Sequence, residues 1–168
     1  MIYEVREKGT SLGQGDVFQQ CPLLYWTATR NQAGQLQLQT ASSDERVIVV
    51  TQACDLANTR TSKVQVAVVH ATAKLVNAGI LKAQTIRDQV RRHLVFGWYF
   101  LPAGEENPES IVDLRDIHTV PRDLLEEQIG LGHRRSAVLT PYREHLAQHF
   151  ATTYSRIALP EPYETVAD

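Results

Sequence analysis

The hydrophobic residues of this chain are gathered in short β-prone segments, and the densest segment lies at residues 47–50. Val47 to Val50 is a run of four β-branched residues, which is typical of a strand buried on both faces. A second core strand, residues 64–69, is expected to pair with it. The first strand leads directly into five polar side chains: Thr51, Gln52, Cys54, Asp55 and Asn58. Because a rigid strand that ends in polar residues commonly holds a site, we expect candidate site residues there.

The rest of the chain supplies further strands. β-prone runs and alternation of apolar and polar residues predict them at residues 2–5, 17–18, 23–29, 36–39, 93–101, 111–120 and 134–139. Cys21-Pro22 is expected to separate the strand at residues 17–18 from the strand at residues 23–29. Residues 41–44 are expected to form a polar turn. Leu36 and Leu38 alternate with glutamines, which predicts a half-buried antiparallel strand.

Three segments carry a helical pattern. Residues 73–90 predict one helix, or two short helices divided at Gly79. Residues 122–130 predict a second helix, with acidic side chains near its start where the helix dipole favours them. Thr140-Pro141 predicts the start of a third helix, with a capping residue followed by proline. Apolar side chains recur every four residues along it and predict a core stripe: Leu146, Phe150 and Tyr154.

Many short strands with a few helices predict an α+β fold that is mainly antiparallel β. We expect a small SH3-like barrel with inserted and C-terminal helices. The chain has 168 residues, which predicts a single domain over residues 1–160 followed by a flexible tail at residues 161–168.

Composition and charge narrow the functional classes. The hydrophobic fraction of 43% and the charged fraction of 21% are ordinary for a globular domain. A net charge of −2 gives no general attraction to nucleic acid, so such a partner would need a local basic patch. The sequence shows neither the apolar core of a signal peptide nor the ~20 apolar residues of a membrane helix. With only two cysteines, far apart, we expect a cytoplasmic protein without a disulfide framework, and a Cys21–Cys54 bridge is the alternative. We expect no membrane association, and no cofactor because no P-loop, dinucleotide fingerprint or zinc ribbon is present.

Cys54 is a candidate for chemistry, because a cysteine at a strand end can act as a nucleophile when a histidine lies within reach. Free cysteine is more often a small buried side chain, and no signature of a cysteine enzyme surrounds this one. We therefore expect Cys54 to be packed and structural. Asp55 and Asn58 are more simply explained as turn residues.

His145 and His149 share one face of the third predicted helix. Leu146 stands where a zincin motif needs glutamate, and no third ligand has diagnostic spacing. We therefore expect a solvated helix face and no metal site. Arg91 and Arg92, with Trp98 nearby, could bind single-stranded RNA, since guanidinium groups neutralise phosphates and rings stack on bases. The alternative is that these arginines pair with surface carboxylates.

Three features of the first seventy residues occur in a recognisable order. Gly15-Asp16-Val17-Phe18 begins a strand, Arg46 precedes the β-branched run that ends at Thr51, and residues 64–69 follow. This order resembles the MazF/PemK family of toxins, small SH3-like barrels that cut RNA. The resemblance implies a metal-independent ribonuclease in which the RNA 2′-hydroxyl attacks the phosphate and Arg46 stabilises the transition state. The other catalytic candidates that it suggests are Thr51, His70, Thr72 and His93.

Two departures from that family keep a second function open. In the toxins the arginine is followed by proline, where this chain has Val47, and the second strand here runs into His70-Ala71-Thr72, which displaces the catalytic threonine. These departures and the net negative charge favour a non-catalytic barrel that binds a protein, such as a component of the same bacterial operon, or that pairs as a homodimer. The arginine clusters and the polar strand end favour the ribonuclease. The binding candidates are Gln52, Cys54, Asp55, Asn58, Arg91, Arg92 and Trp98.

Overall fold

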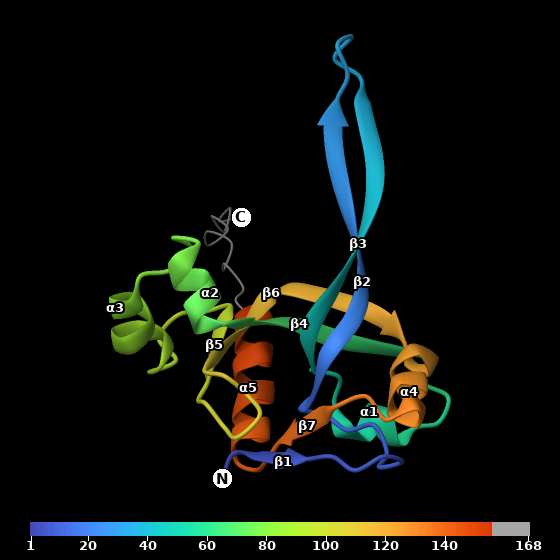
Figure 1. Cartoon of the computed structure of the whole chain (residues 1–168), viewed down its shortest axis with the longest axis vertical. Coiled ribbons are helices and arrows are strands. Elements are labelled where there is room, and N and C mark those ends of the chain that lie inside the picture. The colour runs from blue at the N-terminus through green and yellow to red at the C-terminus, as the bar shows by residue number, and fades with distance from the viewer. Residues whose placement is uncertain (156–168) are drawn as a thin grey trace, which may run out of the picture.

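Within residues 1–155, which the computed structural model describes, seven antiparallel strands form one sheet with helices around it (Figure 1). The strands are β1 (Tyr3–Val5), β2 (Asp16–Arg30), β3 (Leu36–Val49), β4 (Lys63–Ala71), β5 (Trp98–Leu101), β6 (Ser110–Pro121) and β7 (Arg135–Val138). The helices are α1 (Ala53–Ala57), α2 (Thr72–Asn77), α3 (Ala83–Thr85), the π-helix η1 (Ile86–Val90), α4 (Arg122–Leu131) and α5 (Tyr142–Tyr154). The predicted α+β class, mainly antiparallel β, is confirmed. The predicted tail at residues 161–168 lies outside the described residues.

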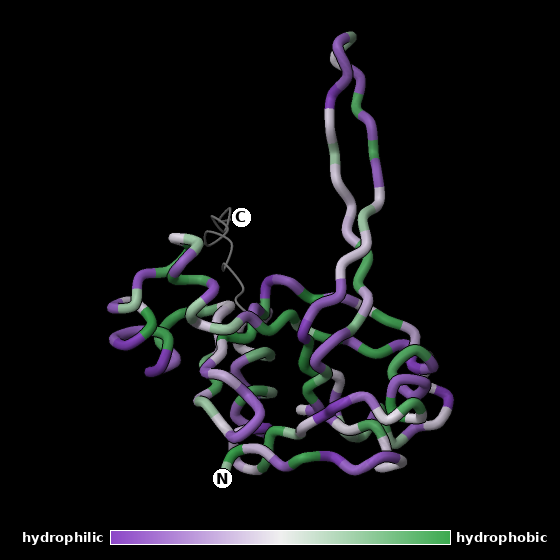
Figure 2. The backbone as a smooth tube through the Cα atoms, in the orientation of Figure 1, coloured by the Kyte–Doolittle hydropathy of each residue, from purple (hydrophilic) through white to green (hydrophobic). Residues whose placement is uncertain are grey.

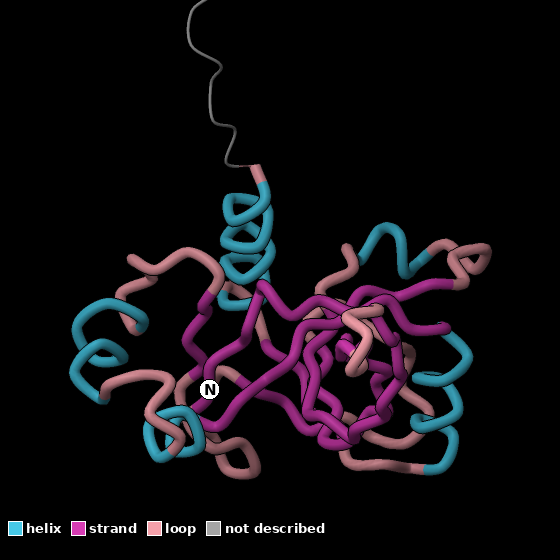
Figure 3. Tube along the Cα trace, turned by 90° about the horizontal axis from the view of Figure 1, so that it is seen from above, coloured by secondary structure: helices cyan, strands magenta, loops and turns pink. Residues whose placement is uncertain are grey.

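The strand order is β1-β7-β2-β3-β4-β6-β5, so β3 and β4 are neighbours inside the sheet. Val47 lies opposite Val68, which confirms the predicted pairing of the two core strands. The register of β4 on β6 shifts between Ala67 and Val68, and such an irregularity bends a strand. Figure 3, a view from above, shows the strands curling round on themselves.

The central strand is buried on both faces, as its β-branched run predicts. Val47 and Val49 belong to one apolar cluster, which also contains Leu125 of α4. Ile48 belongs to a second cluster, with Leu146 of α5. Successive side chains of a strand point to opposite faces, so β3 separates two cores and holds helices on both sides.

A third, smaller core joins the inserted helices to the sheet. Leu75 of α2 and Val90 of η1 pack in one cluster with Trp98 of β5. Residues 73–90 therefore form short helices, in agreement with the prediction that Gly79 divides them. Of the predicted strand at residues 93–101, only Trp98–Leu101 is β-structure, because His93 adopts a φ of 55° and turns the chain before it.

The β2–β3 hairpin differs from its prediction. Pro22 does not interrupt β2, whose register shifts instead between Phe18 and Cys21, and residues 41–44 continue β3 rather than turning. β7 pairs with β2 only from Asp16 to Phe18. Beyond that point β2 pairs with β3 alone, and proline is tolerated where a strand has a free edge.

Helix α5 also differs in detail. It begins at Tyr142 after Pro141, without a side-chain hydrogen bond that caps it, so Thr140 does not act as the predicted cap. Leu146 is buried as predicted. Tyr154 is exposed, and His149 is buried in its place. No described helix has the length and apolar character needed to cross a membrane.

Candidate functional site

The distal part of the β2–β3 hairpin projects from the body as an isolated ribbon (Figure 1). We call residues 24–42 the arm. Leu24 lies opposite Ser42 at its base, and Arg30 lies opposite Leu36 near its tip. The preceding residue, Leu23, is buried in the core, so the body ends and the arm begins at this point.

The register places the large apolar side chains of the arm on one face. Residues directly opposite each other in an antiparallel pair share a face, and Trp26 faces Thr40 while Ala28 faces Leu38. The apolar face therefore consists of Leu24, Trp26, Leu36 and Leu38, which are 69%, 74%, 58% and 61% exposed. The prediction that Leu36 and Leu38 lie on a half-buried strand is wrong, because nothing among the described residues covers this face.

The opposite face of the arm is polar. Thr27 lies opposite Gln39 and Thr29 opposite Gln37, and Figure 2 shows hydrophobic and hydrophilic positions mixed along the arm. Between residues 24 and 42 the sole charged side chain is Arg30. A ribbon with a single charge and one apolar face is typical of a surface that another polypeptide covers.

The tip of the arm is ordered by its own hydrogen bonds. The side-chain oxygen of Asn31 accepts from the backbone N–H of Ala33 at 3.0 Å and of Gln35 at 2.9 Å. Gly34 adopts a φ of 76°, which glycine does without strain. These contacts close the turn at residues 31–34 and fix the register of the two strands of the arm.

Arg46 lies where β3 enters the body, and its side chain is half-buried. Its guanidinium donates to Ser110 Oγ at 2.7 Å and to Asn107 Oδ1 at 2.6 Å, while Nε has no partner among residues 1–155. Burial lowers the pKa of this arginine, and Tyr3 offsets part of that effect. Arg46 is thus engaged by neutral groups of the loop before β6, and Asn107 links it onward to Ser136 of β7 at 3.1 Å.

Thr72 and Arg91 meet at the carboxylate of Glu109. Thr72 Oγ1 donates to Glu109 Oε1 at 3.1 Å, and Arg91 forms an ion pair with the same carboxylate. Together with Arg87 they line a cavity of about 480 Å³ between α2 and η1. A carboxylate beside a hydroxyl and two guanidinium groups could accept a proton near a bound anion. His70 lies at the end of β4 opposite Ile111, and it does not line this cavity.

Trp98 is buried, and the guanidinium of Arg115 lies 4.0 Å from its ring centroid. Asp113 holds Arg115 through a bond of 3.0 Å to Nε. A ring covered in this way cannot stack on a nucleotide base, so Trp98 does not fit the predicted RNA groove. Arg92 is exposed, and Arg91 is occupied by Glu109.

A cluster of histidines around Tyr99 was not anticipated as a unit. His93 stacks on Tyr99 with centroids 4.7 Å apart, and its ring meets those of His145 at 4.6 Å and His149 at 5.8 Å. His149 is 8% exposed, whereas His145 is exposed. The expectation of a solvated helix face therefore holds for His145 and is wrong for His149. Burial lowers the pKa of His93 to about 4, and the neighbouring histidines add to the shift. Within the described residues, no group of three or more His, Cys, Asp or Glu side chains is arranged to hold a metal ion.

The polar residues after the central strand lie elsewhere. Thr51 Oγ1 accepts from the backbone N–H of Gln65 at 2.7 Å, and Gln52 precedes α1. Asn58 Oδ1 accepts from the backbone N–H of Arg60 at 3.0 Å, which is the turn role expected of it. Cys54 is exposed, so the expectation that it is packed is wrong, and Asp55 beside it is exposed as well.

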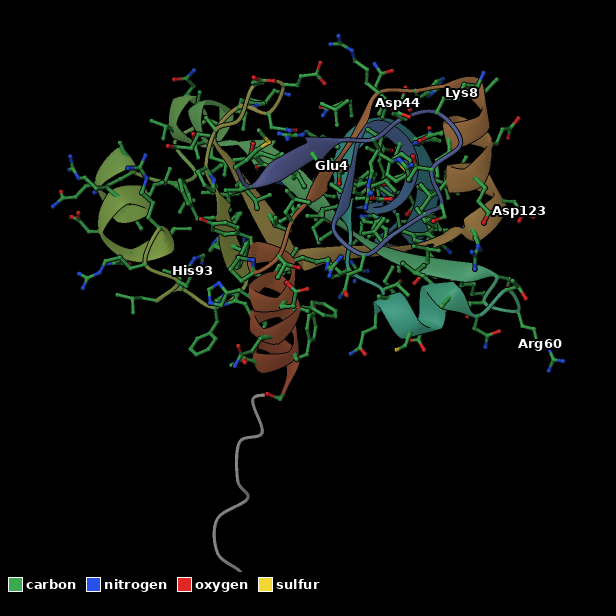
Figure 4. All side chains as sticks on the ribbon, turned by 90° about the horizontal axis from the view of Figure 1, so that it is seen from below. Glu4, Lys8, Asp44, Arg60, His93 and Asp123 are labelled. Carbon is green, nitrogen blue, oxygen red and sulfur yellow. The ribbon has the colours of Figure 1, made fainter. Side chains whose placement is uncertain are left out.

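The structure therefore separates the predicted site residues instead of bringing them to one site. Figure 4 shows His93 beside α5, and Arg60 beyond α1 on the other side of the molecule. Thr72 and Arg91 come together, with Arg46 connected through the adjacent Ser110, whereas Thr51 to Asn58 stand apart. Four contributors were not predicted from the sequence: Arg87, Asn107, Glu109 and Ser110. An acidic loop gives no sign of which carboxylate, amide or hydroxyl turns inward.

No model of a protein family matches the chain, and no curated protein matches it.

Proposed function

We propose that this chain is a non-catalytic protein-interaction module, a divergent barrel of the MazF/PemK type that binds a component of the same bacterial operon in the cytoplasm. The observation that carries the proposal is the apolar face of the arm. Four large apolar side chains project into solvent on a ribbon that has one charge. Each fully buried Leu or Phe contributes ~1.5–3 kcal/mol relative to exposure, so a partner that covers this face gains several such contributions.

The surroundings of Arg46 support a non-catalytic role. A guanidinium that stabilises a phosphate transition state must be free to donate to the phosphate oxygens. Here one N–H of each terminal nitrogen already donates to a neutral group, Ser110 or Asn107, and the side chain is half-buried. A phosphate would have to compete with these contacts. Arg46 instead joins β3 to the loop before β6 and so holds the root of the arm in place.

Affinity capture from the native host tests this proposal. The apolar-face variant, Trp26→Ser with Leu38→Ser, is compared with an opposite-face control, Thr27→Ser with Gln39→Ser, and with the wild type. We expect the wild type and the control to retain the same partner proteins, and the apolar-face variant to lose them. Identical partner sets for both variants, with both folded by circular dichroism, would contradict the proposal.

A ribonuclease is the second candidate, and the carboxylate of Glu109 between Thr72 and Arg91 favours it. In that reaction Glu109 would take the proton of the RNA 2′-hydroxyl, a 2′-oxygen–phosphorus bond would form, and the 5′-oxygen would leave with a proton from water. Arg87 and Arg91 would bind the phosphate. The residues that line this cavity in the described part of the chain include no histidine to act as the acid, and this places the reaction second.

Incubation of a long single-stranded RNA with the purified chain in EDTA separates the two functions. The interaction proposal predicts no cleavage by the wild type. Cleavage that Glu109→Gln and Arg87→Ala both abolish would establish the ribonuclease. Asp123→Asn is a suitable control, because Asp123 on α4 lies far from this cavity (Figure 4).

A further inference from the structure

The body carries an apolar groove that nothing in the described residues fills. It has a volume of about 490 Å³ and lies between β1 and the loop at residues 103–107. Ile2, Tyr3, Val5 and Ala103 contribute its apolar lining. Its length follows β1, whose partner β7 covers only one of its two edges.

The groove is a built feature and not a loose gap. Tyr3 donates its hydroxyl proton to the carbonyl of Pro102 at 3.0 Å, and Gly104 packs so closely on the Tyr3 ring that an added Cβ would lie 2.6 Å from it. Asn107 fixes the loop to the sheet, because it accepts a hydrogen bond from Arg46 and donates one to Ser136. An unpaired strand edge beside an apolar slot is suited to receive an extended segment of another chain.

The arm matches this groove in shape and charge. One strand of the arm fits a slot bounded by a strand edge, and its apolar face meets an apolar lining. Three acidic residues also line the groove: Glu4, Glu105 and Glu106. Glu4 pairs with Arg6 and Glu106 pairs with Arg134, each at 3.4 Å, so Glu105 is the groove carboxylate that has no ion-pair partner among residues 1–155. The arm brings the opposite sign, because its one charge is Arg30.

An arm cannot reach the groove of its own chain. Figure 1 shows the arm rising from one end of the body, while β1 lies at the other end. The complementary groove must therefore belong to another molecule.

The area of the arm's apolar face indicates how many arm–groove contacts a stable dimer needs. The arm from Leu24 to Arg30 is about 23 Å long and about 10 Å wide by strand dimensions. One such face buries less than the ~800 Å² per partner of a stable interface, and two reciprocal contacts double that area.

We infer that the first occupant of the groove is the arm of a second copy of this chain, exchanged reciprocally in a two-fold dimer. The inference rests on the proposed function, in that both use the apolar face of the arm. It adds the receiving surface, and it implies that an operon partner, which covers the same face, competes with the second copy for the arm.

Sedimentation velocity of the purified chain over a dilution series tests the inference. We expect a dimer that the opposite-face control retains and that the apolar-face variant weakens by about 30-fold or more, the usual scale for loss of a central aromatic anchor. A monomeric wild type would overturn the inference, as would assembly into open chains of higher mass.

Charge reversal identifies the two surfaces. Arg30→Glu is made on one chain, and Glu4→Arg with Glu105→Arg, one acid from each side of the groove, on another. Each variant alone places like charges at both of its contacts and should dimerise about tenfold more weakly. In a mixture each arm meets a groove of opposite charge, so the two variants should form a 1:1 pair with wild-type affinity.

Failure of this pairing, with both variants folded, would overturn the arm–groove contact, and a groove variant that dimerises normally would show that arms contact arms. These results leave the proposed function open to separate refutation. If the purified chain is monomeric while the apolar-face variant still loses its partners in cells, only the second-copy inference fails.

Discussion

The ion pair between Asp16 and Arg135 offers a quantitative test of how the root of the arm is held. Asp16 begins β2 and is 0% exposed, and Arg135 of β7 is 4% exposed. Arg135 Nη1 donates to Asp16 Oδ2 at 2.6 Å, and Nη2 donates to the carbonyl of Thr10 at 2.7 Å. The backbone N–H of Gly13 donates to the same carboxylate at 2.8 Å. Burial raises the pKa of Asp16, and Arg135 offsets part of that rise.

Replacement of Asp16 by Asn keeps the shape of the side chain and removes the charge. The buried guanidinium of Arg135 then has no full counter-charge, and loss of one partner of a buried pair costs about 3–5 kcal/mol. A domain of this size loses ~2–4 °C of melting temperature per kcal/mol, so the variant should melt ~6–20 °C lower. Urea unfolding followed by circular dichroism gives the free energy directly.

A double-mutant cycle isolates the pair. Arg135→Met removes the cation, and the double variant should be ~1–3 kcal/mol more stable than the sum of the two single losses predicts, because neither member of the pair then stays buried as a lone charge. Arg6, which also contacts Asp16 at 3.4 Å, is kept in all the variants. An Asp16→Asn loss below ~1 kcal/mol, or strict additivity in the cycle, would refute the reasoning.

Three further outcomes follow from burial and exposure. Since burial lowers the pKa of His93 to about 4, the unfolded chain binds the proton more readily between pH ~6.5 and ~4. Stability should therefore be fully present above that window and fall by ~1–2 kcal/mol as pH drops through it, after allowance for solvent screening; an unchanged pH profile in His93→Gln would contradict this. Thiol reagents should label Cys54 rapidly and Cys21 only on unfolding, because Cys21 is buried and burial raises its pKa to about 11; equal rates would argue against the structure. Val49→Asp should unfold the domain because Val49 is 0% exposed, and a soluble variant with a cooperative melt would disprove its place in the core.

The burial of the central strand was predictable because it depends on the residues of that strand alone. Val47 to Val50 has no polar face, so burial on both sides was the only arrangement consistent with it. The arm was not predictable in the same way. Alternation of Leu36 and Leu38 with glutamines shows that a strand has two unlike faces, but it does not say what covers the apolar one. Propensity also could not show that Pro22 lies on a strand edge that β7 leaves free.

In the candidate site, too, features set by neighbouring residues were predictable from the sequence, and contacts between residues far apart in the sequence were not. The spacing of His145 and His149 placed them on one helix face, and this is local. Their surroundings depend on His93 and Tyr99, which lie about fifty residues earlier and reach α5 only through the sheet. Spacing alone therefore could not distinguish a solvated face from a buried cluster. The four-residue spacing of the apolar stripe correctly predicted a helix with a buried side. The spacing did not give the rotation of the helix about its axis, which makes His149 more buried than Tyr154.

The most direct test of the account is whether another polypeptide covers the apolar face in the cell. Oxidative footprinting of Trp26 compares the host cell with dilute purified protein, and Trp98, which is buried in the body, serves as the internal reference. We predict that Trp26 reacts several-fold more slowly in the cell while Trp98 reacts equally in both. An equal rate at Trp26 would show that the arm stays uncovered, and would contradict a function in protein interaction through this face.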